Sequence, residues 1–523
     1  MTAKEMIAEG QCFLGIEFGS TRIKAILIDN EYRPVAAGSY QWENRFENGY
    51  WTYSLEEIHK GLKECYADLK RDVREQYGIV PSSFKAMGIS GMMHGYMPFD
   101  KDGNLLVPFR TWRNTTTARA AEELTELFGF NIPQRWSIAH LYQAILDNEP
   151  HIGSIAHITT LAVYICYLLT GERAAGFGEA SGMFPVDKKG YDSVMLEKFS
   201  ELVKKYNFSW NIHDVLPKPA SCKEPCGQLT EKGAMFLDPD GDLKAGVPFC
   251  PPEGDAGTGM TATNAVRERT ANVSAGTSVF SMAVLEKPLS RVYPQIDVVA
   301  TPDGSPVAMV HCNNCCAELD AWVGAFKEFC KLMGIKADKS ELYQKLYRHA
   351  MEKGDRDCGG VMSYNFLSAE PVAEIEKGKP MYFRSIDSNF NLANFFRSQL
   401  MTSLSALKMG MDILFEKEGL KLDKLAAHGG LFKVEGAADM LLADGLNTPV
   451  TLTETAGEGG AWGMALLAAY MSENLGASLG DFLDEKVFGG MMSREVIPSE
   501  EGVLGFEKYI EKFKGGLKAV DQL

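Results

Sequence analysis

Basic residues are scarce in this 523-residue chain, which has 53 lysines and arginines against 69 acidic residues and a formal net charge of −16. A protein that binds nucleic acid or an anionic membrane is expected to present a basic face, so this balance argues against both partners. The net charge does not exclude binding of small anionic ligands, because local dipoles can hold them. No low-complexity segment dominates, and 45% hydrophobic residues indicate an ordinary folded protein.

Long hydrophobic runs are also missing. The most apolar run, residues 155–169, contains His157 and two threonines and is typical of a buried helix. The N-terminal residues lack a basic stretch followed by an apolar one, so we expect no secretory signal and a cytoplasmic protein. Eleven cysteines fit reduced thiols in that compartment. Metal binding by HCNNCC (311–316) or CKEPC (222–226) is weakly indicated at most.

The length predicts two or three domains, and the sequence contains an internal repeat. FLGIEFGSTRIKAILID (13–29) reads as two strands joined by the turn Gly19-Ser20-Thr21. TANVSAGTSVFSMAVLE (270–286) repeats this pattern around residues 276–278. Because the two turns are separated by a domain length, the sequence predicts two duplicated halves.

Further strands and helices follow each of these hairpins. Ser54 to Glu57 has the form of a capping box, which predicts the start of a helix. Mixed sheets with helices outside them are therefore expected. Further strands are predicted at 32–42, 84–90, 424–428 and 449–454, and helices at 434–446, 460–470 and 506–517.

The two small-residue turns are candidate phosphate sites. Glycine and hydroxyl residues at a turn expose main-chain N–H groups that can hold phosphate oxygens. One such turn is a weak signal, whereas two at this spacing could grip one nucleotide from two sides. Glu17 precedes the first turn, where a carboxylate would repel phosphate unless Mg²⁺ lay between them. Alternatively, Glu17 is a solvent-exposed or ion-paired acid near a turn and binds no metal.

Asp255 is the candidate general base. It follows Gly254 and precedes small residues that can begin a helix. A carboxylate near a helix N-terminus stays ionised, which suits a group that accepts a hydroxyl proton. A simple helix N-cap is the alternative.

The motifs together resemble the FGGY carbohydrate kinases, which share the fold of actin, Hsp70 and hexokinase, and are most similar to the xylulokinases among them. The resemblance implies an α/β fold of duplicated ribonuclease H-like domains, with mixed sheets flanked by helices and an interdomain cleft. The domains would be 1–268, 269–475 and a tail, 476–523, packed on the second. The matching motifs are GIEFGSTRIKAILID, GISGMMHG (88–95), LTGE (169–172), EASG (179–182), GDAGTG (254–259), SAGTS (274–278), HGGLF and EGGAWGMALLAA.

The resemblance also implies roles for individual residues. Asp255 matches the catalytic base, and ATP and Mg²⁺ would be required, with Glu17 on the metal. Met93, His94, Trp112 and Asn114 match sugar-contacting positions. The implied nucleotide-binding residues are Gly19, Ser20 and Thr21 in the first turn, Gly276, Thr277 and Ser278 in the second, and Gly429 with Gly430 at adenosine.

Several positions depart from the family pattern. Glu17 replaces the usual aspartate, and Trp112-Arg113-Asn114 replaces a Trp-Asn-Asp or Trp-Gln-Asp sequence. A lysine- and tryptophan-containing stretch is poorly reproduced at 137–145, and Leu431 replaces a glycine. These departures concern the identity of the sugar more than the type of reaction.

We therefore expect phosphorylation of a primary hydroxyl of a ketopentose, with xylulose as the first choice. Ribulose, a sugar acid such as gluconate, and a polyol such as glycerol remain alternatives, and Arg113 would favour an acidic sugar if it pointed inward. A nucleotide-dependent switch of the actin or Hsp70 type is the alternative from another class. Sugar and ATP are the expected partners, and the sequence leaves a homodimer open.

Overall fold

The computed structural model describes residues 1–453, 459–473 and 476–522, which form two compact units. Unit 1 comprises Met1–Val266, Val298–Val307 and the described residues of Glu458–Met491. Unit 2 comprises the described residues of Arg267–Asp297, Ala308–Gly457 and Met492–Leu523. Each unit has its own buried apolar core.

Unit 1 is built on a mixed sheet that starts with the predicted hairpin. β1 (Phe13–Phe18) pairs antiparallel with β2 (Arg22–Ile28), which pairs with β3 (Pro34–Gln41). β1 also pairs in parallel with β6 (Ala86–Gly91), and the connection contains α2 (Leu55–Tyr77). Strands run in the order β13-β14-β6-β1-β2-β3, with β13 at Gly227–Gln228 and β14 at Pro248–Phe249.

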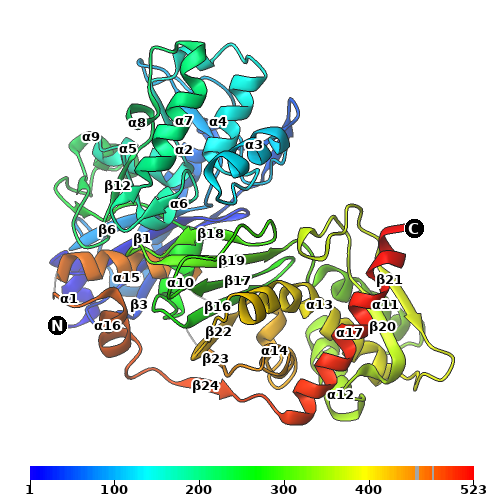
Figure 1. The fold of residues 1–523 in the computed structure, drawn as a ribbon. Coiled ribbons are helices and arrows are strands. Elements are labelled where there is room, and N and C mark those ends of the chain that lie inside the picture. Colours follow the sequence, from blue (N-terminus) through cyan, green and yellow to red (C-terminus); the bar gives the residue numbers. More distant parts are fainter. Residues whose placement is uncertain (454–458, 474–475, 523) are drawn as a thin grey trace. The chain divides into compact units, whose positions relative to one another are not determined.

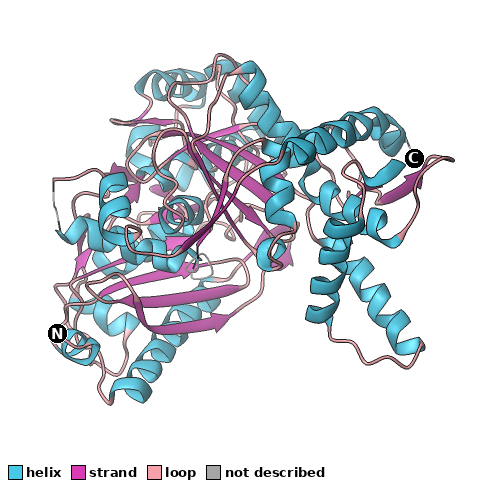
Figure 2. Cartoon of the chain, turned by 90° about the horizontal axis from the view of Figure 1, so that it is seen from below, coloured by secondary structure: helices cyan, strands magenta, loops and turns pink. Residues whose placement is uncertain are grey.

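Unit 2 repeats this arrangement. β16 (Thr270–Ala275) pairs antiparallel with β17 (Val279–Val284) and in parallel with β22 (Lys424–His428), as β1 does with β2 and β6. The duplication predicted from the two turns is therefore confirmed, and helices accompany both sheets (Figure 2). The sheet also contains β19 (Pro306–Cys312), most of which belongs to unit 2, and β23 (Val450–Thr453) and β24 (Ser493–Val496).

The remaining helices differ in detail from the prediction. Residues 155–169 do not form one helix, because β8 (His157–Thr159) pairs with β7 (Met97–Phe99) before α5 (Leu161–Thr170) begins. The helix expected from Val434 begins four residues later, as α14 (Ala438–Leu446). The expected terminal helix is longer, as α17 (Glu500–Gln522). Glu454 and Glu458, which the predicted strand and the EGGAWG motif include, lie outside the described residues.

Helix α15 (Gly459–Glu473) packs on the sheet of unit 1, against β1 and β6 (Figure 1). The contact is close because Gly15 has no side chain: a Cβ there would lie 2.1 Å from the main-chain oxygen of Ala461. Sequence order had suggested one domain for 269–475, whereas α15 returns to the unit that contains the N-terminus.

Two general expectations, on the cysteines and on membrane spans, can be compared with the structure. All eleven cysteines are free thiols. Among the described residues, no helix combines the length and apolar character needed to cross a membrane.

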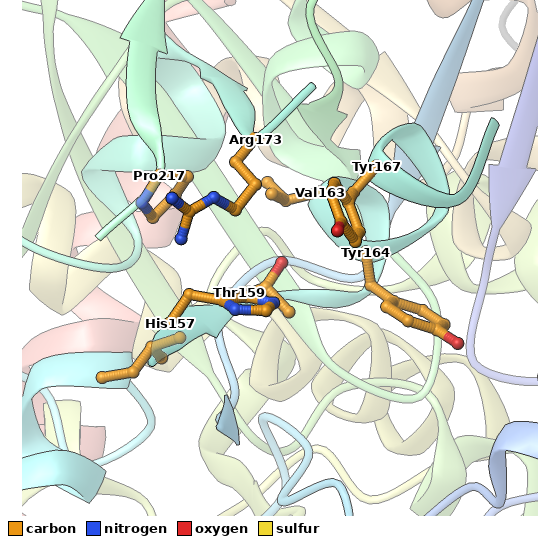
Figure 3. A pocket seen from close by; sticks show the side chains of 8 residues that line it. His157, Thr159, Val163, Tyr164, Tyr167, Arg173 and Pro217 are labelled. Atoms are coloured by element: carbon orange, nitrogen blue, oxygen red, sulfur yellow. The ribbon is translucent and has the colours of Figure 1, made fainter. Parts of the chain in front are cut away.

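A narrow cavity in unit 1, lined by residues that include His157, Tyr164, Tyr167 and Arg173 (Figure 3), measures about 10 Å³. That volume suits one water molecule and excludes a sugar or nucleotide.

Replacement of Gly15 by alanine should destabilise unit 1 by at least about 1–3 kcal/mol, because the new methyl group meets main-chain atoms of α15 that cannot move independently. Gly324→Ala, inside α11 (Ala317–Leu332), is the matched control: the position is open, so a gain of about 0.5–1 kcal/mol is expected. Melting temperatures of both variants check this, and a Gly15→Ala protein as stable as the wild type would contradict the packing described.

Candidate active site

The first turn, residues 19–21, holds its carbonyl groups toward the interior of unit 1. The indole Nε1 of Trp42 donates to the Gly19 oxygen at 2.7 Å, and the Tyr53 hydroxyl donates to the Ser20 oxygen at 2.6 Å. Trp42 and Tyr53 stack with ring centroids 4.1 Å apart, which fixes both donors. Because these two carbonyls are held, the N–H groups of Ser20 and Thr21 in the same peptide units point the other way, as an anion site requires. The Gly19 N–H is not available, since it donates to the Arg22 oxygen at 3.0 Å.

The second turn, residues 276–278, is held in the same way within unit 2. The main-chain N–H of Cys315 donates to the Thr277 oxygen at 2.9 Å, and that of Cys316 donates to the Gly276 oxygen at 3.1 Å. The HCNNCC segment therefore supports this turn through its main chain. The two turns are equivalent in strand context and in the anchoring of their carbonyls.

Gly429 and Gly430 lie beside the second turn. Gly429 has a φ of +110°, and a Cβ there would lie 2.2 Å from the main-chain oxygen of Ala275, the residue before Gly276. Only glycine satisfies both conditions. A Cβ at Gly430 would meet open space, so the fold itself does not require glycine at that position. The predicted adenosine-binding pair is thus adjacent to the predicted phosphate turn of the same unit.

Glu17 is the penultimate residue of β1 and receives main-chain hydrogen bonds from Gly460 and Ala461, at the N-terminus of α15. Burial and the nearby negative charge of Asp255 raise the pKa of Glu17 to about 7. The two amides and Lys24, its partner across the β1–β2 ladder, offset part of this increase. Two acids from distant parts of the chain are therefore brought together within unit 1.

Asp255 is the first residue of α10 (Asp255–Ala262), and Gly254 occupies the N-cap position. Its Oδ1 accepts from the Ala256 N–H at 3.0 Å and from the Met93 N–H at 3.2 Å. Surrounding protein atoms raise the pKa of Asp255 although the side chain still contacts solvent. The sequence had suggested that the helix N-terminus keeps this carboxylate ionised. In the structure, burial outweighs that effect and raises the pKa instead. A raised pKa suits a group that must take up a proton.

Met93 and His94 connect Asp255 to helix α6 (Phe177–Ser181). His94 is buried, and its Nδ1 donates to the main-chain oxygen of Gly182 at 3.2 Å. Its φ is +69°, an uncommon conformation for a residue with a large side chain. Strain of this kind concentrates at functional sites, so the observation favours a role for the predicted Met-His pair.

The Trp112-Arg113-Asn114 segment is arranged differently from what the resemblance implies. The Asn114 side chain donates to the main-chain oxygens of Trp51 and Thr111 and accepts from the Trp51 N–H. Both of its amide hydrogens are thus used within the protein. Arg113 is exposed, and its guanidinium lies 3.8 Å from the centre of the Trp51 ring. Trp112 packs against the core of unit 1.

Sequence reasoning missed two kinds of residue. Trp42 and Tyr53 act on the first turn through side chains more than twenty residues away, which no local pattern reveals. Glu179 and Glu253 are buried acids next to Asp255 in the fold. Their only signal was an acid inside each of two small-residue motifs, EASG and EGDAGTG.

The two duplicated α/β sheets, each with one of the equivalent turns, have the actin-like ATPase fold. Models of the FGGY family of carbohydrate kinases match this chain over residues 12–259 for the N-terminal domain and 271–472 for the C-terminal domain. The chain belongs to this family, and it is a carbohydrate kinase. FGGY kinases use ATP.

Individual relatives differ in the sugar that their names give. Xylulose kinase of Haemophilus influenzae is 26% identical over 86% of this chain and 89% of its own length. Two solved structures from Lactobacillus acidophilus, a ligand-bound xylulose kinase and a gluconate kinase, each superpose with a TM-score of 0.78 at 15% and 16% identity. Each superposition covers 98% of this chain and 99% of the solved chain. These likenesses show the fold alone.

The difference between Gly429 and Gly430 allows a test of adenosine binding. Gly430→Ala should leave the melting temperature unchanged within about 2 °C, because the methyl group meets no protein atom, yet weaken ATP binding about tenfold if adenosine lies against it. Gly429→Ala should instead destabilise unit 2. Titration calorimetry with ATP gives the affinities, and unchanged affinity in Gly430→Ala would remove this residue from the nucleotide site.

Proposed function

We propose that this kinase transfers the γ-phosphoryl group of ATP to a primary hydroxyl of a ketopentose, with xylulose as the first choice. The observation that carries the proposal is the placement of Asp255 beside Glu17 and in hydrogen-bond contact with the Met93 main chain. Two relatives that match over most of this chain are named xylulose kinase, and they support the choice of sugar.

Asp255 would act as the general base. Its raised pKa makes it a better proton acceptor than an ordinary aspartate, and Oδ1 is held by two N–H groups, which leaves Oδ2 for the sugar hydroxyl. The proton of that hydroxyl would pass to Asp255 as the oxygen attacks phosphorus, and ADP would leave. Phosphoryl transfer depends mainly on alignment and charge neutralisation, which the two turns would supply through their amides.

Glu17 would hold Mg²⁺, and the donor set fits this ion. Mg²⁺ usually takes one or two protein carboxylates and completes its shell with water and substrate phosphates. Glu17 offers one carboxylate, with that of Asp255 close enough to raise its pKa. The bound ion would neutralise phosphate charge. That both turns hold one nucleotide remains a prediction.

Sugar-dependent release of ADP tests the proposal directly. The wild type should respond to D-xylulose, and Asp255→Asn should lower kcat about 10²–10⁴-fold because the hydroxyl loses its base. ATP should still bind to the variant, since the amides of both turns are unaffected.

A panel of D-xylulose, D- and L-ribulose, D-gluconate and glycerol separates the alternatives. Stimulation by another member of the panel would replace xylulose as the substrate. A response to none would favour a nucleotide switch, and normal turnover in Asp255→Asn would remove Asp255 from the role of base.

The coupling between Glu17 and Asp255 predicts a pH dependence of metal binding. Glu17 has a raised pKa of about 7, so its carboxylate is protonated below that pH and Mg²⁺ affinity should fall as the pH falls through 7. Asp255→Asn removes the neighbouring charge, so the fall should move to lower pH. Mn²⁺ binding with ATP, followed by electron paramagnetic resonance, measures both curves. Identical curves would contradict the coupling.

A further inference from the structure

Glu179 is a buried acid that the proposed mechanism does not use. It lies in α6, its residue is fully buried, and no hydrogen-bond partner is found for either carboxyl oxygen among the described residues. Burial and the charges of Glu253 and Asp255 raise its pKa well above the ordinary value. The nearby hydroxyl of Thr160 lowers this pKa in part, although the two groups do not meet in a hydrogen bond of ordinary geometry. Native proteins rarely retain such groups without a functional reason.

The position of Glu179 relates it to the sugar-binding residues. A Cβ placed on Gly254 would lie 2.8 Å from Glu179 Oε2 and 2.0 Å from Cγ of Met93. The carboxyl and the Met93 side chain thus lie together over the residue that precedes Asp255. Met93 has an unbranched, adaptable side chain, so a rotamer change can open the carboxyl to a ligand.

Glu253 shows what a structural acid in the same place looks like. Its two oxygens accept from the main-chain N–H groups of Gly178 at 3.3 Å and Glu179 at 3.0 Å. A Cβ on Gly176 or Gly178 would lie within 2.4 Å of this carboxylate, so the glycines make room for it. Glu253 thereby fixes the main chain of α6, whereas the carboxyl oxygens of Glu179 have no hydrogen bond of ordinary geometry to any described residue.

Other unpartnered polar atoms surround the same loop. Trp136 stacks on His94 with ring centroids 6.3 Å apart, and its Nε1 is buried without a partner among the described residues. The side-chain oxygen of Gln134, two residues earlier, is also buried without a hydrogen-bond partner among the described residues. The Trp136 N–H is a donor, the Gln134 oxygen is an acceptor, and the Glu179 carboxyl can form hydrogen bonds as well. This combination matches a ligand with several hydroxyl groups.

We propose that Glu179 is a substrate-binding residue: its carboxyl hydrogen-bonds a hydroxyl of the sugar. This inference rests on the proposed kinase function. It assigns a sugar contact to one residue outside the Met93-His94 pair and Asp255.

Glu179→Met tests the contact, because methionine has nearly the same shape but makes no hydrogen bond of this strength. KM for D-xylulose, or for whichever neutral sugar is phosphorylated, should rise about 10–100-fold, while KM for ATP should stay within about twofold. The melting temperature should rise by about 2–4 °C, since an unpaired buried polar group is removed. Lower affinity together with higher stability is not expected of a merely structural residue.

Glu179→Gln is the matched control, because it keeps a hydrogen-bonding group of the same size. KM for the neutral sugar should therefore stay within about threefold of the wild-type value. An unchanged KM for the neutral sugar in Glu179→Met, an equally large rise of that KM in Glu179→Gln, or a fall in melting temperature with equal effects on the KM values for sugar and ATP would overturn the inference. If the wild type responds to no neutral sugar, the proposed function and this inference fail together.

Discussion

The hydrogen bonds between the Glu17 carboxylate and the start of α15 are the constraint on which the site in unit 1 depends. They join the end of the first strand to a helix more than 440 residues later in the chain. A helix N-terminus stabilises a carboxylate, so this contact partly offsets the burial and the repulsion from Asp255 that Glu17 experiences. The same helix packs on β1 at Gly15 and on α10, which begins with Asp255. The helix that supports Glu17 therefore also positions the proposed base.

The two anion turns follow a different physical rule. An amide can bind phosphate only if its own peptide group is oriented outward, and a peptide group is oriented by what its carbonyl oxygen contacts. Side chains of Trp42 and Tyr53 hold the carbonyls of the first turn, and main-chain N–H groups of Cys315 and Cys316 hold those of the second. The duplicated halves thus reach one geometry with different chemical groups.

Local sequence patterns were sufficient for the hairpins and for the duplication, because a strand, a small-residue turn and a second strand are specified by neighbouring residues. The destination of α15 was not predictable in that way. Its sequence is apolar on all sides, so the pattern indicates burial and does not indicate which sheet covers it. The unit to which α15 belongs is decided by glycines such as Gly15, whose role is visible only when both partners are placed.

The acids around Asp255 show the same limit at the level of chemistry. Glu179 and Glu253 both stand in small-residue motifs, and their sequences do not distinguish them. In the structure the carboxylate of Glu253 is satisfied by main-chain N–H groups, whereas that of Glu179 is not. Hydrogen-bond satisfaction separates an acid that shapes the fold from one available to a ligand. Together with the left-handed conformation of His94, the unsatisfied carboxyl places the destabilising features of unit 1 beside Asp255, where binding energy from a substrate can offset them.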